Sequence, residues 1–143
     1  MAYVTLHHPK LTLEGAEAVL KAAQAHADRM SVPMIIAIVD DGGYLMAFAR
    51  MDGAKISSVD IAMAKAVSAA IRRQPTGPVM KGDEINILAS LSLTVGSHAR
   101  QISLRGGLPL VANAECVGAI GVSAGTEEQD LEVARAGVAA LGA

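Results

Sequence analysis

The chain has 143 residues, and its formal net charge of −2 comes from 12 Lys and Arg residues against 14 Asp and Glu residues. This length suits a single domain over residues 1–143, and hydrophobic residues make up 52% of the chain, enough to build a core. Because the basic residues are scattered, the sequence predicts no binding of nucleic acid and no attraction to an anionic membrane.

The first predicted element is an amphipathic helix over residues 13–30. Its apolar residues recur at steps of three and four, and charged residues fill the opposite side. Thr12 is the expected N-cap, and Pro33 closes the exit. The continuous apolar run 34–39 and the alternating run 44–50 flank an Asp-Asp-Gly-Gly turn, which predicts two strands joined as a hairpin.

A second helix is predicted from Ser57 to about Arg73, with Ser57 and Asp60 forming a start that resembles a capping box. Small or apolar residues occupy almost every side of this helix. We therefore expect it to be buried between the sheet and a further layer, for which another subunit is one source.

Residues 80–105 form the least regular part of the sequence. We expect Asp83 to cap a short helix that runs through Leu91, and a loop to follow Gly96. This segment gives the weakest pattern in the chain.

The last part of the chain predicts a second hairpin and a final helix. Residues 108–112 and 115–123 are the expected strands, with Asn113-Ala114 as their turn. Thr126 and Gln129 form a capping box for a helix that continues to about Leu141.

Strands connected by hairpins indicate an antiparallel sheet, because parallel strands need longer crossovers. The predicted fold is α+β, with four to five antiparallel strands and flanking helices in the order helix, hairpin, helix, hairpin, helix. Residues 4–6 are the expected fifth strand, at the edge of the sheet. No glycine-rich phosphate loop stands between a strand and a helix, so the sequence shows no nucleotide fingerprint.

Several strings along the chain resemble one family. Residues 37–54 contain AIVDDGG and FARMDGA, Lys65 lies within Ala-Lys-Ala, and residues 106–130 contain GGLP, VGAIGVS and EQD. In this order, from Leu11 to Leu141, they resemble the GlcG/HbpS family, and also the C-terminal domain of PduO-type corrinoid adenosyltransferases. The resemblance implies an antiparallel sheet flanked by helices, a homo-oligomer, and haem or a related tetrapyrrole as the small-molecule ligand.

The chain departs from the pattern of that family between Arg73 and Arg105, where a shorter segment richer in Gly and Pro is expected. The resemblance implies that this segment takes part in the ligand pocket. Members of the family have several roles, including haem sensing, so the identity of the ligand stays open at this point.

Arg50 and Lys65 are the predicted anion-binding residues. Arg50 stands at a strand end before a turn that contains Asp52, where its guanidinium can grip a carboxylate such as a haem propionate, or pair with Asp52 or Asp40. Lys65 interrupts an apolar helix and needs a partner or an anion. The two cations form either one anion clamp or separate structural contacts, such as a subunit-interface salt bridge for Lys65.

The Gly106-Gly107 turn and His98 complete the predicted ligand site. The glycines permit close backbone approach at a pocket rim, or form a plain turn before Pro109. His98 precedes them in a polar segment and is the preferred histidine for an axial ligand of haem iron or for acid–base chemistry. We expect Arg50, Lys65 and the two glycines to border one cleft, which either a single copy or a neighbouring subunit completes.

Three functions stay open on the sequence alone. The first is a haem-binding protein; the second is an isomerase or lyase acting on a small organic acid, with Lys65, Arg50, Asp52 or His98 in the site; the third is an oligomeric accessory protein.

A lone Cys116 in an apolar run predicts a buried thiol. No signal peptide is visible, and no apolar run approaches the roughly 20 residues of a membrane span, so a cytoplasmic location is expected.

Overall fold

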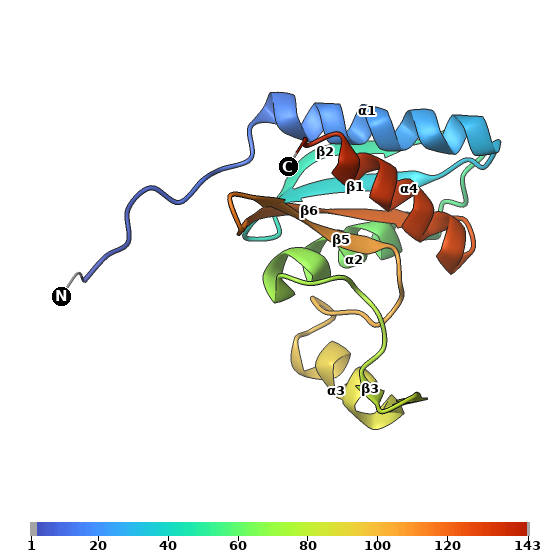
Figure 1. Cartoon of the computed structure of the whole chain (residues 1–143). Coiled ribbons are helices and arrows are strands. Elements are labelled where there is room, and N and C mark those ends of the chain that lie inside the picture. Colours follow the sequence, from blue (N-terminus) through green and yellow to red (C-terminus); the bar gives the residue numbers. More distant parts are fainter. Residues whose placement is uncertain (1–2, 143) are drawn as a thin grey trace.

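The structure, a computed structural model, describes residues 3–142. It contains a four-stranded antiparallel sheet in the order β2-β1-β6-β5, with α1 and α4 on one face and α2 on the other (Figure 1). The elements are α1 (Leu13–Met30), β1 (Ile35–Asp40), β2 (Leu45–Arg50), α2 (Ser58–Arg72), β3 (Met80–Lys81), β4 (Glu84–Ile85), α3 (Ile87–Gly96), β5 (Gly107–Ala112), β6 (Glu115–Ser123) and α4 (Glu127–Ala139). The predicted α+β class, antiparallel sheet and order of helices and hairpins are confirmed.

The sheet has its two most apolar strands at its centre. β1 lies between β2 and β6, so both of its edges are paired, and helices cover both of its faces. Residues 35–39 of this strand are all apolar and buried. Ile36 and Ile38 face α1 and α4, whereas Ala37 and Val39 face α2. The core is therefore two aliphatic layers divided by the sheet.

Helix α2 packs unusually close to the sheet because Gly121 of β6 has no side chain. A Cβ at Gly121 would lie 2.1 Å from the carbonyl oxygen of Ala62. On another side of α2, Ser68 Oγ accepts a hydrogen bond from the backbone N–H of Ile102 at 3.2 Å. The expected further layer over α2 is thus supplied in part by the same chain.

The predicted helix starts differ in outcome. Thr12 accepts a hydrogen bond from the N–H of Gly15, and Thr126 with Gln129 forms the full capping box, so both predictions are confirmed. Ser57 makes no side-chain cap, and that prediction is wrong. The backbone of Ser57 is already helical. The turn that starts the helix begins before Ser57, at Lys55, whose carbonyl accepts a hydrogen bond from the N–H of Ser58.

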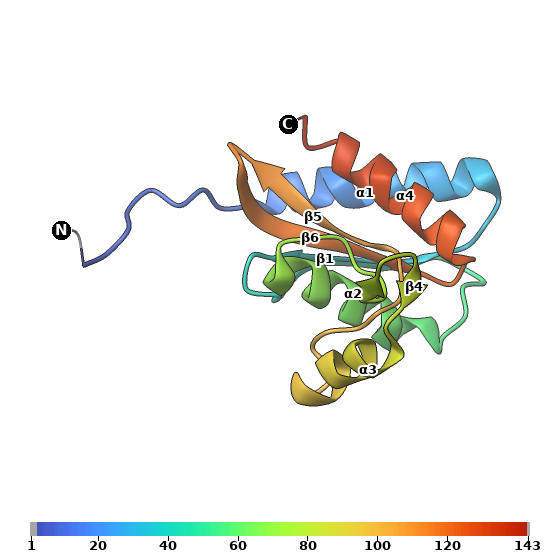
Figure 2. The ribbon, with the colours of Figure 1, turned by 60° about the horizontal axis from the view of Figure 1, so that its bottom comes forward.

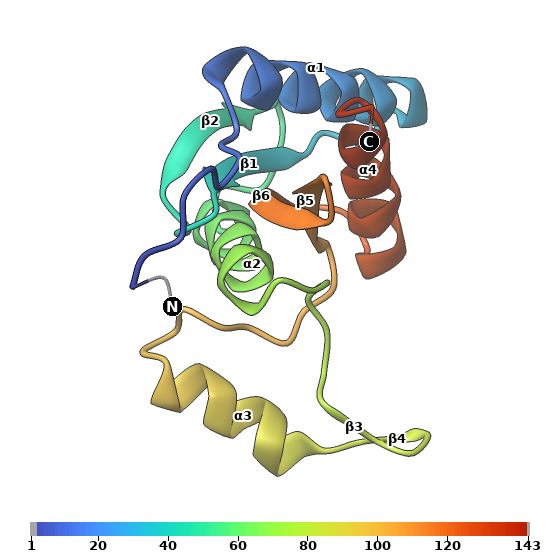
Figure 3. The ribbon, with the colours of Figure 1, turned by 60° about the vertical axis from the view of Figure 1, so that its left-hand side comes forward.

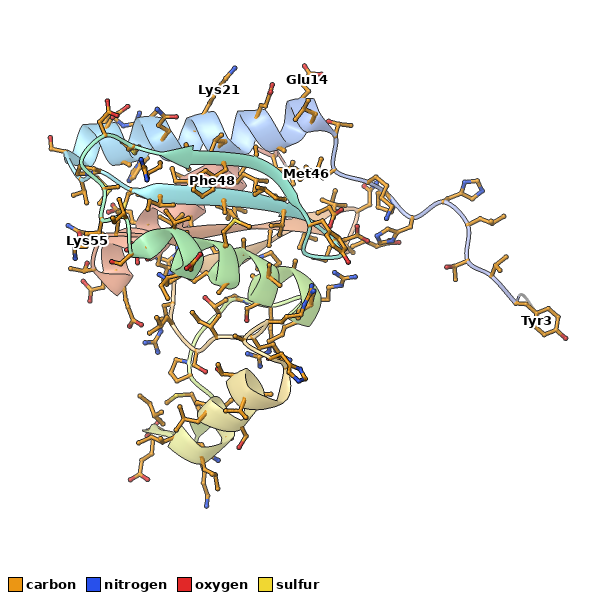
Figure 4. All side chains as sticks on the ribbon, turned by 180° about the vertical axis from the view of Figure 1, so that it is seen from behind. Tyr3, Glu14, Lys21, Met46, Phe48 and Lys55 are labelled. Atoms are coloured by element: carbon orange, nitrogen blue, oxygen red, sulfur yellow. The ribbon has the colours of Figure 1, made fainter. Side chains whose placement is uncertain are left out.

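The predicted edge strand at residues 4–6 is also wrong. Residues 3–7 run out from the body without strand pairing (Figure 1), and Val4 and Leu6 are 70% and 73% exposed. His7 adopts a left-handed backbone conformation with φ of 66°, and Pro9 has no N–H to donate, so strand geometry is interrupted at the end of this segment. Figure 4 shows Tyr3 at its far end, and also shows Glu14 and Lys21 pointing away from the sheet on the solvated face of α1.

Residues 80–104 form an excursion away from the sheet, on the far side of α2 (Figures 2 and 3). The helix expected here is present, but its cap is Asn86, whose Oδ1 accepts from the N–H of Ala89 at 3.0 Å, and it runs to Gly96 rather than Leu91. Asp83 lies in the turn between β3 and β4 instead. None of the helices in residues 3–142 is long and apolar enough to cross a membrane.

Candidate functional site

A hollow of about 430 Å³ lies where α1 and β2 both end. Helix α1 ends because Ser31 turns left-handed, with φ of 57°, and its N–H donates to the carbonyls of Ala27 and Asp28. Arg50 is the last residue of β2, and the next N–H, that of Met51, still donates to the carbonyl of Met34 at 3.0 Å. The lining residues are Gln24, Ala27, Asp28, Ser31, Val32, Pro33, Arg50, Met51 and Asp52.

The lining combines one cation, two carboxylates and an aliphatic wall. Arg50 supplies the guanidinium, Asp28 and Asp52 supply the carboxylates, and Val32 and Pro33 contribute apolar surface. Within the described residues, Arg50 forms no ion pair with Asp52 or with any other carboxylate. The volume of the hollow falls inside the range of about 300–1,000 Å³ that small-molecule sites occupy. Because Arg50 forms no ion pair there, its guanidinium is available to an anionic ligand.

Lys65 is engaged elsewhere, as a buried link between α2, β6 and α4. Its side chain is 2% exposed, and Nζ donates to Asp130 Oδ2 and to the carbonyl of Val122, both at 2.8 Å. The other oxygen of Asp130 accepts from the N–H of Gly125 at 2.9 Å. The partner that this lysine was expected to need is therefore Asp130, and Lys65 does not line the hollow.

The glycine pair lies beside Lys65. A Cβ on Gly106 would come within 2.9 Å of Lys65 Nζ and 2.7 Å of the Val122 carbonyl oxygen, and the backbone has φ of 121°. Gly107 donates its N–H to Thr76 Oγ1 at 2.9 Å. The sequence predicts close approach of the backbone at these glycines, and the group that they approach is the buried ion pair of Lys65 and Asp130.

Arg50 and the glycine pair lie at opposite edges of the sheet. Gly106 accepts a backbone hydrogen bond from Val122, which is paired across β1 with Ile36 and from there with Ala49 of β2. Three strand spacings of about 4.8 Å separate the two edges, roughly 14 Å. Within one copy, the residues expected to border a single cleft are therefore separated: Lys65 meets Gly106 and Gly107 in the interior, whereas Arg50 and Asp52 line the hollow.

His98 lies at a third position. It is exposed, two residues beyond the end of α3, with φ of 54°. Two residues later, Arg100 donates to the carbonyl of Gly42 at 3.2 Å, which ties this segment to the turn before β2. Because Arg50 ends β2 and Gly42 precedes its start, His98 and Arg50 do not meet in one copy. The role of His98 as an iron ligand stays a prediction, and within residues 3–142 no group of three or more His, Cys, Asp and Glu side chains is arranged to hold a metal ion.

Sequence reasoning missed a charged cluster around His8. The ring nitrogens of His8 lie 3.2 Å from Asp41 Oδ2 and 2.5 Å from Glu115 Oε2, and Lys10 Nζ lies 3.2 Å from Asp41 Oδ1. Burial raises the pKa of the Asp41 carboxyl, but the hydrogen bond and charge of Lys10, a backbone hydrogen bond and the charge of His8 together lower it below 3.8. Nearby, Cys116 is half-buried rather than fully buried, and its thiol donates to the carbonyl of Gly118 at 3.3 Å.

Sequence reasoning also missed three polar residues of the hollow, Gln24, Asp28 and Ser31. Gln24 and Asp28 lie on the polar side of α1, which indicates solvation rather than a site, and Ser31 is the residue that caps the end of this helix. Only the packing of this helix end against the end of β2 brings them to Arg50.

Comparison with known proteins identifies the family. Residues 11–139 match the family described as haem degrading protein HbpS-like. A Citrobacter freundii protein, described as an uncharacterized 15.0 kDa protein in the dhaT-dhaS intergenic region, is 38% identical over 84% of each chain. The crystal structure of Klebsiella pneumoniae ORFY superposes with a TM-score of 0.86 at 31% identity, covering 100% of this chain and 99% of that one. A crystal structure of a PduOC:heme complex superposes with a TM-score of 0.80 at 26% identity, covering 92% of this chain and 95% of that one. The chain belongs to the HbpS-like family.

Proposed function

We propose that this protein binds haem or a related tetrapyrrole, with the hollow at the ends of α1 and β2 as the site for its carboxylates. The observation that carries the proposal is the unpaired guanidinium of Arg50 at a concave site, in a chain of a family described by haem chemistry. A structural relative at 26% identity, PduOC, is described as a haem complex.

The cation and the apolar wall of the hollow each have a counterpart in a tetrapyrrole. Arg50 offers a planar fork of donors for a propionate, which makes charge-assisted hydrogen bonds. Val32, Pro33 and Met51 offer apolar contact to the edge of a macrocycle. Met51 is less suited as an iron ligand, since its Sδ already accepts from the N–H of Met34 at 3.4 Å.

Titration with haemin tests the proposal. The wild-type chain should develop a Soret band that saturates, and Arg50→Ala should weaken binding about tenfold, or roughly 1.4 kcal/mol, because one charge-assisted contact is lost. Lys55→Ala, which removes an exposed cation outside the hollow, is the matched control and should bind as the wild type does.

His98→Ala tests the predicted iron ligand separately. If His98 coordinates iron, its removal changes the Soret maximum, because the axial ligand of the iron is lost. A wild-type chain that gives no saturable Soret change contradicts the proposal as a whole.

A second candidate function is favoured by the carboxylates of Asp28 and Asp52 beside Arg50. An anion held by the guanidinium next to two carboxylates is the arrangement of an enzyme that moves a proton on a small organic acid. In that case short-chain carboxylates should raise Tm of the wild type, and Arg50→Ala should abolish the increase while haemin has no effect.

A further inference from the structure

The hollow at the ends of α1 and β2 has a negative formal charge, although the ligand proposed for it binds through an anion. Of the described residues that line it, Arg50 alone carries a positive charge, whereas Asp28 and Asp52 contribute two carboxylates. Both acids are exposed, and within residues 3–142 neither forms an ion pair. The two negative charges are therefore left for a ligand to meet.

The end of α1 adds to this negative character. Helix α1 ends at Met30, and Ala27 and Asp28 of its last turn line the hollow. The carboxyl end of a helix carries a partial negative charge, about half an elementary charge. A carboxylate in the last turn is disfavoured for the same reason, so the stability of α1 does not account for an acid at Asp28.

Asp52 is held at the hollow by a tight turn. The N–H of Ala54 donates to the carbonyl of Met51 at 3.1 Å, and Gly53 within this turn has φ of 85°, which side chains rarely tolerate. A Cβ on Gly53 would lie 3.6 Å from Pro33 Cγ, so the turn packs beside the apolar wall of the hollow. One carboxylate thus stands on a helix and the other on a hydrogen-bonded turn, and both are in place before a ligand binds.

A ligand that presents one carboxylate fits this set of charges. The guanidinium of Arg50 can bind one carboxylate through two parallel hydrogen bonds. A second carboxylate would find no further cation in the lining and would be repelled by Asp28, Asp52 and the end of α1, whereas a cationic group there would be attracted. We propose that Asp28 and Asp52 are specificity-determining residues, which limit the hollow to one carboxylate of its ligand and favour a neutral or cationic group beside it. For a tetrapyrrole with two propionates, the ligand on which this selectivity rests under the proposed function, the second propionate then stays in solvent.

Three small acids of similar length test the selectivity without haemin. Butyrate carries a single negative charge, glutarate carries two, and γ-aminobutyrate carries one charge of each sign. At equal ionic strength, Tm of the wild type should rise most with γ-aminobutyrate, less with butyrate and least with glutarate, because a bound ligand stabilises the folded state. The double variant Asp28→Asn/Asp52→Asn should reverse this order, and Arg50→Ala should remove all three increases. Added salt should shrink the differences between the acids, since the hollow is open to solvent.

Methyl esters of haemin test the same selectivity on the proposed ligand. The wild type should bind haemin and its monomethyl ester with the same Kd, because only one free propionate is used. The dimethyl ester should bind about tenfold more weakly, since it has no carboxylate for Arg50. In Asp28→Asn/Asp52→Asn the second propionate can enter, so haemin should bind about threefold more tightly than its monomethyl ester, the size of one exposed charge interaction.

The matched control is Glu17→Gln/Asp83→Asn, which gives the chain the same net charge as Asp28→Asn/Asp52→Asn and should behave as the wild type. Glu17 is exposed on α1 outside the hollow, and Asp83 lies in the turn between β3 and β4, on the far side of α2 from α1 (Figure 3). A wild type that responds to none of the three acids or prefers glutarate, an order unchanged in Asp28→Asn/Asp52→Asn, or the same reversal in the control would overturn the selectivity. Absence of haemin binding would instead contradict the proposed function, and the small acids would still decide the role of the two carboxylates.

Discussion

Replacing Lys65 with Met removes one half of a buried ion pair and leaves the other half in place. Lys65 and Asp130 are 2% and 4% exposed and 2.8 Å apart, so the Asp130 carboxylate would remain buried opposite an apolar side chain. Breaking a buried pair in this way costs about 3–5 kcal/mol. For a domain whose total stability is about 5–15 kcal/mol, this loss lowers the urea midpoint strongly without changing the native spectrum.

A double-mutant cycle identifies the source of the loss. Asp130→Asn keeps an oxygen for the N–H of Gly125 while removing the charge, so Lys65→Met combined with Asp130→Asn should recover a large part of the lost stability, with a coupling energy of about 0.5–3 kcal/mol. Lys55→Met is the control at an exposed lysine. Exposed ion pairs contribute less than about 1 kcal/mol. A loss that small in Lys65→Met would refute the role of Lys65 as half of a buried ion pair, and Lys65 would again be a candidate ligand-binding residue.

Three further predictions concern the fold. Gly121→Ala should cost about 3 kcal/mol or more and lower Tm by several degrees, because the new methyl group meets the Ala62 carbonyl 2.1 Å away; an unchanged Tm would contradict this packing. Thr126→Ala should cost about 1 kcal/mol in urea unfolding, since the α4 capping box is lost. Lys10→Met should cost less than about 1 kcal/mol at neutral pH. Lys10 helps to lower the pKa of Asp41 in the folded chain. The stabilisation that the Lys10–Asp41 pair gives to the folded state is therefore fully present above the unfolded pKa of about 3.9, and it is lost as pH falls through the lowered pKa of the folded state. Wild type and Lys10→Met should therefore converge in acid, and a constant difference would refute the pairing.

The local patterns of the sequence predict most of the fold because they report local physics. The apolar run at 34–39 identifies a central strand, and Asn113-Ala114 identifies a turn whose two residues have φ of 51° and 63°. The failures at Ser57 and at residues 4–6 have a common cause. Each depends on what the neighbouring chain does, an earlier turn at Lys55 or a missing sheet partner, and composition does not carry that information.

The site was less predictable than the fold for the same reason. Arg50 was identified from its place at a strand end, and the structure puts it on a hollow. Lys65 was identified as a cation within an apolar helix, but its partner Asp130 lies 65 positions away in the sequence. A buried ion pair and an anion clamp give identical local patterns, so only the packing of α4 distinguishes them.

The order of the strands in the sheet has a consequence for synthesis of the chain. β1 finds its first partner at once in β2, but its other edge waits for β6, where Ile35 pairs with Ser123. Until that strand emerges from the ribosome, β1 of a nascent chain has one edge of unpaired backbone N–H and C=O groups, and such an edge is a template for pairing with another chain. We expect the joining of the two hairpins to be the slow step of folding, because it brings together residues that are distant in the sequence. Chains that stop before β6 should accumulate in inclusion bodies, and chaperones that shield nascent strands should act on this protein during that interval.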